Sequence, residues 1–91
     1  MKLDNIEIIQ INISGEDKPG LTSSLTGILA RHDAFILDIG QSNIHQSLTL
    51  GILFMTTPDR SGQIMKELLF KASEKNITIR FEPITLEQYS N

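Results

Sequence analysis

The amino-acid sequence predicts a single α+β domain, and three observations lead to this fold class. Apolar residues alternate with polar ones in four separate stretches, which is typical of β-strands. Two other stretches repeat their apolar residues every three or four positions, which is typical of amphipathic helices. The chain of 91 residues has the length of one domain and is 40% hydrophobic, which is enough for a modest core.

The first elements are a strand and a helix. Residues 6–14, IEIIQINIS, are expected to form a strand with Ile9, Ile11 and Ile13 on its buried face. Residues 19–32 are expected to form a helix, because one apolar stripe runs through Leu21, Leu25, Ile28 and Leu29. Pro19 is expected in the first turn of this helix, where its missing N–H costs nothing.

A hairpin of two strands is expected next. The first strand, residues 34–44, is predicted to place three apolar side chains on one face: Phe35, Leu37 and Ile39. Within it, Gly40 suggests a bulge or a close approach by another backbone. Residues 48–55 alternate in the same way and are expected to be the third strand. The turn between the two strands is expected at Gln46 and Ser47.

The second half of the chain predicts another helix and a final strand. Asp59 or Ser61 is expected to cap the helix, and Asn76 is expected to end it in a left-handed conformation. Its buried face is expected to consist of Ile64, Met65, Leu68, Leu69 and Ala72. Residues 77–82 are predicted to form the fourth strand, which Pro83 ends or marks as a sheet edge. Residues 84–91 are interpreted as the start of a connection.

The order of these elements, βαββαβ, is typical of a ferredoxin-like fold. Right-handed crossovers then place both helices on one face of a four-stranded antiparallel sheet. The other face is expected to carry several apolar side chains: Ile6, Ile8, Ile36, Leu53 and Met55. Exposed apolar patches of this kind usually mark an interface, so we expect a homodimer or a paired domain to cover it.

The composition disfavours several classes of partner and compartment. The net charge is −3 and no basic run exceeds one residue, which disfavours nucleic acid. RNA-binding domains of this fold stack bases on sheet aromatics, whereas Phe35, Phe54 and Phe81 are expected in the core. The apolar runs are too short to cross a membrane, and Met1–Asn5 lacks the apolar segment of a signal peptide. A cytoplasmic location is therefore expected.

The sequence offers no catalytic or metal-binding constellation. There is no cysteine, which excludes disulfides and thiolate metal sites. His32 and His45 have no partners at metal-ligand spacing and are expected at the surface or at helix ends. The serines lack the setting of a catalytic nucleophile. We therefore expect no enzyme activity from this chain alone.

One loop has a physical argument for ligand binding. The segment GEDKPGL, residues 15–21, leads from a strand end into a helix N-terminus. The backbone N–H groups there lack intrahelical partners and attract a carboxylate. Gly15 and Gly20 would let a ligand approach the backbone, and Asp17 suits an ammonium group. The loop matches an amino acid zwitterion, although an ordinary turn from strand to helix accounts for the same residues.

The motif GEDKPGL, together with ILDIGQS at residues 36–42, resembles the ACT domain family. ACT domains are small ferredoxin-like regulatory modules that typically bind amino acids. The stretch HQSLTLGILF, residues 45–54, is similar to the N-terminal regulatory segment of phosphoserine phosphatases that carry ACT domains. The resemblance implies that residues 1–91 form one regulatory domain. It also implies that this domain senses serine or a related amino acid and controls an attached phosphatase of serine biosynthesis.

The resemblance also implies a set of ligand-binding residues. Those of the first loop are Gly15, Asp17, Pro19, Gly20 and Leu21, and those of the second strand are Ile36, Leu37, Asp38 and Gln41. The family holds its ligand where the first loop of one module meets the second strand of a neighbour. It implies no cofactor in this chain, because Mg²⁺ would belong to a phosphatase domain and its Asp-x-Asp motif is absent here.

The chain departs from the family pattern at the start of the second strand. Many members have an asparagine there, whereas this sequence reads Ala34-Phe35-Ile36. Losing that amide removes a polar contact with the ligand. Two alternatives therefore stay open: a dimerisation module without a ligand, and a regulatory ACT protein that acts alone.

Overall fold

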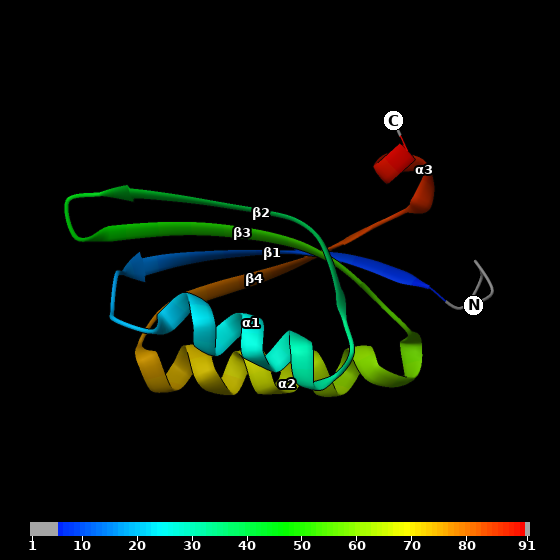
Figure 1. The fold of residues 1–91 in the computed structure, drawn as a ribbon, viewed down its shortest axis with the longest axis horizontal. Coiled ribbons are helices and arrows are strands. Elements are labelled where there is room, and N and C mark those ends of the chain that lie inside the picture. Colours follow the sequence, from blue (N-terminus) through cyan, green and yellow to red (C-terminus); the bar gives the residue numbers. More distant parts are fainter. Residues whose placement is uncertain (1–5, 91) are drawn as a thin grey trace.

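The computed structural model describes residues 6–90 and confirms the predicted order of strands and helices. Residues 1–5, considered above for a signal peptide, and Asn91 lie outside the described residues. The elements are β1 (Glu7–Glu16), α1 (Leu21–Arg31), β2 (Phe35–Ile44), β3 (Ser47–Thr56), α2 (Pro58–Lys75), β4 (Thr78–Ile84) and α3 (Leu86–Ser90). The strands form one antiparallel sheet in the order β2-β3-β1-β4. Both α1 and α2 cover one face of this sheet (Figure 1).

The core lies between the sheet and the two long helices. It is almost entirely aliphatic, as the composition predicts, and Phe54 is its only aromatic residue below 2% exposure in the described chain. The central strands contribute Ile9, Ile11, Ile13, Leu48, Leu50, Ile52 and Phe54, and the helices contribute Leu21, Leu25, Ile28, Leu29, Ile64 and Leu68. The predicted apolar stripe of α1 is therefore confirmed residue by residue.

Strand β2 contains a bulge that the sequence analysis placed at the wrong residue. Ile36 pairs with Phe54, and Asp38 pairs with the next residue of β3, Leu53, so Leu37 is the extra residue. Gly40, where a bulge was suggested, instead pairs directly with Gly51. The bulge breaks the alternation of β2 because two residues there oppose one on the partner strand.

The predicted faces of β2 are wrong as a result. Phe35 lies opposite Met55 on the face away from the helices and is 62% exposed, so it is not a core residue. Ile36 turns toward the helices and packs against the core, although it was predicted on the open face. Ile39 follows the bulge and pairs with Ile52, whose side chain is buried beneath the helices.

The open face of the sheet is apolar at one end only. One row of paired residues crosses all four strands there and consists of Phe35, Met55, Ile8 and Ile84. The rows that follow contain polar residues, such as Gln10 beside Glu82 and Asn12 beside Arg80. Helix α3 lies on this side of the sheet, where a simple connection was expected (Figure 1). The apolar surface expected on the open face is thus smaller than the sequence suggested.

The helix starts differ from the prediction, whereas the end of α2 agrees with it. Pro19 precedes α1, which is capped by Gly20 in a left-handed conformation with φ 77°. Helix α2 begins at Pro58 with Thr57 as its N-cap, so neither Asp59 nor Ser61 is the cap residue. Asn76 ends α2 with φ 57°, as predicted.

At the sheet ends, one detail corrects the sequence analysis and another decides between its two alternatives for Pro83. The β2–β3 turn consists of His45 and Gln46, one residue earlier than expected, and His45 has φ 55°. Strand β4 continues through Pro83 to Ile84 and is an edge strand, so proline marks an edge here and does not end the strand. No helix within residues 6–90 is long and apolar enough to cross a bilayer.

Candidate functional site

The predicted ligand-binding loop connects β1 to α1 at one end of the sheet. Gly15 lies at the end of β1, and a Cβ atom there would come within 2.9 Å of the Ile77 side chain. Two features therefore favour glycine here: the packing against Ile77 and a φ of 156°, which residues with a side chain rarely adopt. Gly20, in contrast, has φ 77° and borders open space, so its role is to let the chain turn into α1.

Asp17 is held at the tip of the β2–β3 hairpin by two hydrogen bonds. Its backbone N–H donates to the carbonyl oxygen of Gln46 at 2.7 Å. The side-chain amide of Asn43 donates to the Asp17 carboxylate, also at 2.7 Å. Bonds to an ionised acceptor are short and comparatively strong, so the carboxylate has a defined position.

Asn43 belongs to a chain of side-chain hydrogen bonds that runs from α1 to Asp17. The Thr22 hydroxyl donates to the side-chain oxygen Oε1 of Gln41 at 3.0 Å, and the Gln41 side-chain amide donates to Oδ1 of Asn43 at 2.9 Å. Gln41 and Asn43 are two residues apart and therefore share the face of β2 that points toward the helices. This series of hydrogen bonds joins α1, β2 and the loop, and it ends at the negatively charged carboxylate of Asp17.

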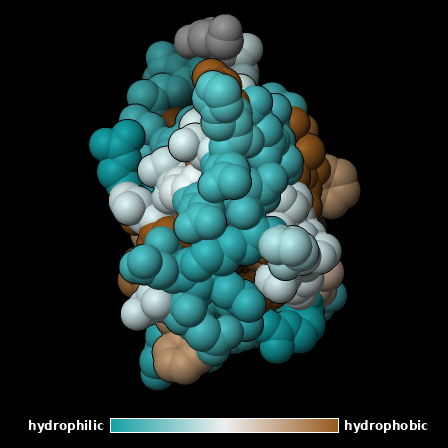
Figure 2. Space-filling view, turned by 90° about the vertical axis from the view of Figure 1, so that its left-hand side faces the viewer, coloured by the Kyte–Doolittle hydropathy of each residue, from teal (hydrophilic) through white to brown (hydrophobic). Residues whose placement is uncertain are grey.

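The first turn of α1 presents free backbone donors beside this chain. The N–H of Leu21 donates to Lys18, and that of Ser24 to Gly20. In the described part of the chain, the N–H groups of Thr22 and Ser23 donate to no backbone oxygen. They border a depression of about 660 Å³ whose lining includes Asp17 and Gly20. Viewed from this end, the surface is mainly hydrophilic (Figure 2).

The predicted site residues divide into two groups. The loop residues 15–21 and Gln41 lie at the hairpin end of the sheet. Ile36, Leu37 and Asp38 lie at the opposite end of β2, and Asp38 is on the open face, opposite Leu53. One copy of the chain does not bring the two groups together. Thr22 and Asn43 were missed by the sequence analysis, although the two-residue spacing of Asn43 from Gln41 was a usable signal.

Comparison with known families decides the classification of this fold and loop. The sequence profile described as "ACT domain" matches residues 7–82. The chain belongs to the ACT domain family. The match covers β1 through β4, so it includes the loop, the bulged strand and both long helices of this ACT domain.

Individual relatives agree with this assignment. Phosphoserine phosphatase SerB2 of Mycobacterium tuberculosis is 42% identical over 45 residues, which cover 50% of this chain but 11% of that protein. A putative glycine cleavage system transcriptional repressor has a TM-score of 0.83 at 15% identity, covering 88% of this chain and 47% of its own. An ACT domain protein from Streptococcus pneumoniae has a TM-score of 0.69 at 19% identity, and the match covers 85% of this chain and 89% of that protein. These structures share the fold of this ACT domain.

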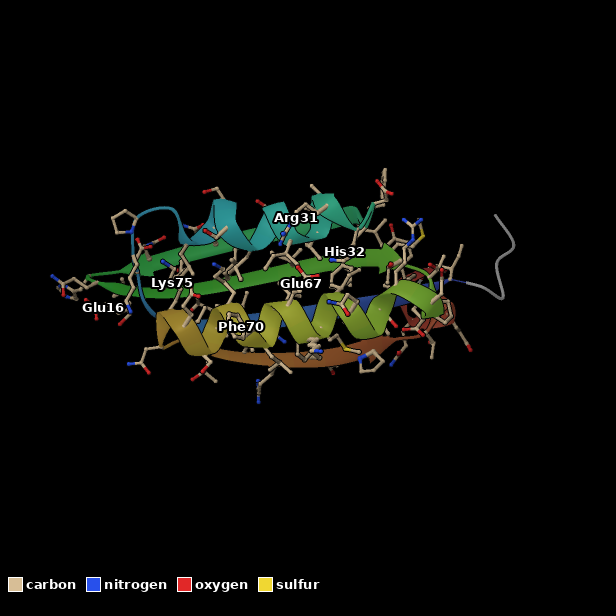
Figure 3. The ribbon with its side chains drawn as sticks, turned by 90° about the horizontal axis from the view of Figure 1, so that it is seen from below. Glu16, Arg31, His32, Glu67, Phe70 and Lys75 are labelled. Atoms are coloured by element: carbon tan, nitrogen blue, oxygen red, sulfur yellow. The ribbon has the colours of Figure 1, made fainter. Side chains whose placement is uncertain are left out.

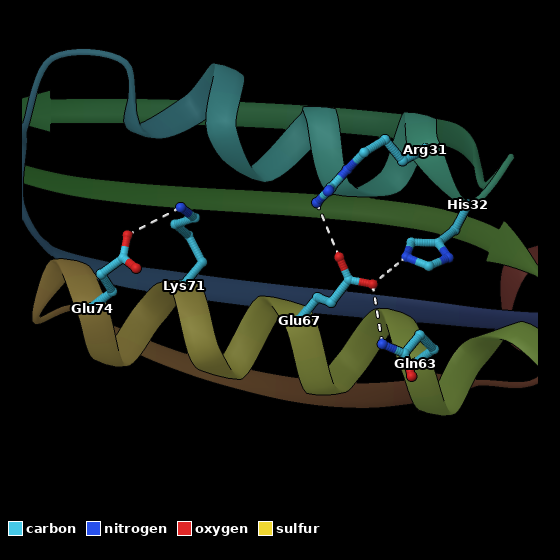
Figure 4. Close-up of polar contacts among 6 residues, drawn as sticks. All are labelled: Arg31, His32, Gln63, Glu67, Lys71 and Glu74. Carbon is cyan, nitrogen blue, oxygen red and sulfur yellow. Dashed lines mark hydrogen bonds and ion pairs between the residues drawn. The ribbon is translucent and has the colours of Figure 1, made fainter.

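A second polar cluster joins the C-terminal end of α1 to the middle of α2. The Glu67 carboxylate of α2 accepts hydrogen bonds from Arg31 at 3.0 Å, from Gln63 at 3.3 Å and from the His32 ring (Figure 4). The hydrogen bond from His32 is the main cause that lowers the pKa of Glu67 below its ordinary value. Within residues 6–90, no group of three or more potential metal ligands forms.

The Glu67 cluster predicts a loss of stability in acid. Because its pKa is lower in the folded chain, ionised Glu67 stabilises the fold above the ordinary glutamate pKa of about 4.3. That contribution is lost as the pH falls through the lowered pKa. We expect Glu67→Gln to flatten the decline of the thermal midpoint as the pH falls below the ordinary glutamate pKa. A decline as steep as that of the unmodified chain would contradict this role.

Proposed function

We propose that this ACT domain binds serine or a related small amino acid between two copies and thereby controls an attached phosphoserine phosphatase. The observation that carries the proposal is the placement of Asp17. Its carboxylate lies beside the free N–H groups of α1 and at one end of β2, an edge strand of the sheet. The match spans only 11% of the length of the phosphatase relative. The attached phosphatase, with any Mg²⁺ that it uses, is therefore part of this proposal.

Pairing through β2 would complete the site. The outer edge of β2 has no neighbouring strand in the described chain and can therefore pair with another β2. If two such strands pair antiparallel about a two-fold axis near Gly40, Leu37 lies opposite Asn43 of the second copy. The residues around Leu37 then come next to the loop of the other copy. This arrangement unites the two groups of predicted residues that one copy keeps apart.

The chemistry of the paired site suits a zwitterion. The N–H groups of Thr22 and Ser23 lie at the positive end of α1 and would receive the ligand carboxylate. Asp17 would receive the ammonium group, since a carboxylate that accepts one bond from Asn43 keeps further acceptor capacity. A nearly empty space beside Gly20 suits a small side chain such as that of serine.

Regulation would follow from linkage between ligand binding and pairing. A ligand that contacts both copies binds the paired state more tightly and therefore shifts the equilibrium toward it. Such a coupling typically amounts to about 1–3 kcal/mol between the ligand site and an attached domain. An attached phosphatase that differs in activity between the paired and unpaired states would then respond to the amino acid.

Calorimetric titration with L-serine and glycine tests the ligand directly. We expect heat on binding, and we expect Asp17→Ala to weaken the affinity about tenfold or more, because a bond to a charged group is lost. Glu16→Ala is the matched control, since it removes a neighbouring exposed negative charge without touching the Asn43 contact. No heat and no thermal shift with either amino acid would contradict the proposed ligand.

A ligand-free pairing module is the second candidate function. It is favoured by Phe35, which stands where many family members have asparagine and is exposed in an apolar row with Met55. This alternative predicts a dimer by light scattering whose mass and stability do not respond to amino acids. Ile39→Lys, on the edge strand and 45% exposed in one copy, is expected to weaken the dimer under either function.

A further inference from the structure

Helix α2 exposes large apolar side chains on the side away from the core. Phe70 is 70% exposed and the neighbouring Leu69 is 50% exposed, although Leu69 was predicted to be buried. Phe70 follows the buried Leu68 by two residues, which is about 200° around the helix. Figure 3 views the molecule from the side of the helices and shows Phe70 on the outer side of α2. Neither side chain is explained by the fold or by pairing through β2.

A groove lies beside Phe70, between α1 and α2. It has a volume of about 520 Å³, and Ile28 and Arg31 of α1 line it together with Lys66, Leu69 and Phe70 of α2. The rest of the lining is Gln63, Glu67 and Lys71, so the groove combines apolar with charged side chains. A protruding aromatic ring next to such a groove makes a surface that can be self-complementary. Such a surface can bind the same surface of a second copy about a two-fold axis.

The charges on α2 match this arrangement. Lys66 lies four residues before Phe70 and Glu74 lies four residues after it, and both are exposed. Glu74 also accepts a hydrogen bond from Lys71 of its own helix at 3.1 Å, and its carboxylate keeps acceptor capacity for a second cation. When two α2 helices run antiparallel with the two-fold axis at Phe70, Lys66 of one copy is level with Glu74 of the other. Because the arrangement is symmetric, it brings two pairs of opposite charge together. We propose that the outer face of α2, centred on Phe70, is a contact surface for α2 of a second copy.

This contact is separate from the pairing through β2. It uses the helix side of the molecule, whereas the β2 edge lies in the plane of the sheet (Figure 1). A chain with both contacts would associate in two steps, and each step would be abolished by a different substitution. The α2 contact therefore stands or falls independently of the proposed amino acid site.

Charge reversal provides the sharpest test, with the mass of the 91-residue chain measured by light scattering over a wide concentration range. Lys66→Glu and Glu74→Lys should each weaken association about tenfold or more, because each places like charges level with one another. The double variant K66E/E74K restores opposite charges across the contact and should recover association. Phe70→Glu should remove this step, and the control Ile39→Lys should remove only the step through β2.

The outcomes separate clearly. Circular dichroism checks that each variant is folded. If Phe70→Glu does not fold, the variants K66E, E74K and K66E/E74K still provide the test. Recovery in the double variant supports the α2 contact. A double variant that associates no better than the single ones overturns it. So does a Phe70→Glu variant that associates like the unmodified chain, or an unmodified chain with no association step other than that removed by Ile39→Lys.

Discussion

Replacing Phe54 with alanine is expected to lower the free energy of unfolding by about 3–5 kcal/mol. Phe54 is fully buried at 0% exposure on the central strand β3, between the sheet and the helices. The substitution removes most of an aromatic side chain and leaves a cavity that the packed isoleucines and leucines around it fill only partly. The whole free energy of unfolding of a small domain is about 5–15 kcal/mol, so this substitution removes a large share of the stability. Urea or thermal denaturation followed by circular dichroism measures the change.

Phe35→Ala is the matched control for this prediction. It removes the same atoms from a side chain that is 62% exposed on β2. We expect it to cost much less than Phe54→Ala when both are measured at low protein concentration, where pairing of copies contributes little. Equal losses would show that Phe35 is buried in the folded chain and that the bulge at Leu37 is placed wrongly.

Two glycine-to-alanine substitutions are expected to change the free energy of unfolding in opposite directions. In Gly15→Ala, the new methyl group would lie 2.9 Å from the Ile77 side chain and 3.3 Å from its Cα atom. Backbone atoms cannot move aside easily, so we expect a loss of about 1–3 kcal/mol through overpacking. In Gly27→Ala, the methyl group meets nothing within 4 Å on the surface of α1. Alanine is the better helix former, and we expect a gain of up to about 1 kcal/mol.

Denaturant unfolding of both glycine variants checks this pair. A tolerated Gly15→Ala would mean that the end of β1 does not approach Ile77 as closely as the structure places it. The explanation of this glycine by packing would then fail. Gly27→Ala serves as the reference, because it makes the same chemical change at a position with free space.

Periodicity predicted the elements of this fold well, because each has a clear pattern. The stripe of α1 and the alternation of β1 depend on which face meets the core, and both were confirmed. The bulge at Leu37 left no such mark, because an extra residue in an apolar run looks the same as regular alternation. The exposure of Phe35 could not be foreseen for the same reason. Leu69 shows the corresponding limit for helices, since an apolar residue beside the buried stripe can face solvent.

The loop of the candidate site was predictable, and its partners were not. Glycine, proline and aspartate between a strand and a helix indicate a turn from local sequence alone. The contact between Asn43 and Asp17 joins residues 26 positions apart, and it depends on the hairpin register that the bulge sets. Sequence analysis had no information on that register, so the contact of Asn43 with Asp17 could not be predicted, although the spacing of Asn43 from Gln41 already placed both side chains on one face of the strand.

The position of Pro83 has a consequence for how this protein avoids fibrous aggregation. Proline has no N–H to offer, and β4 also presents Arg80 and Glu82 along its length, so this margin of the sheet is a poor template for another chain. Growth of the sheet is therefore directed to the opposite margin. In a dimer joined through its two β2 strands, both free sheet margins are β4 strands that contain Pro83. Addition of a third molecule by strand pairing would therefore stop.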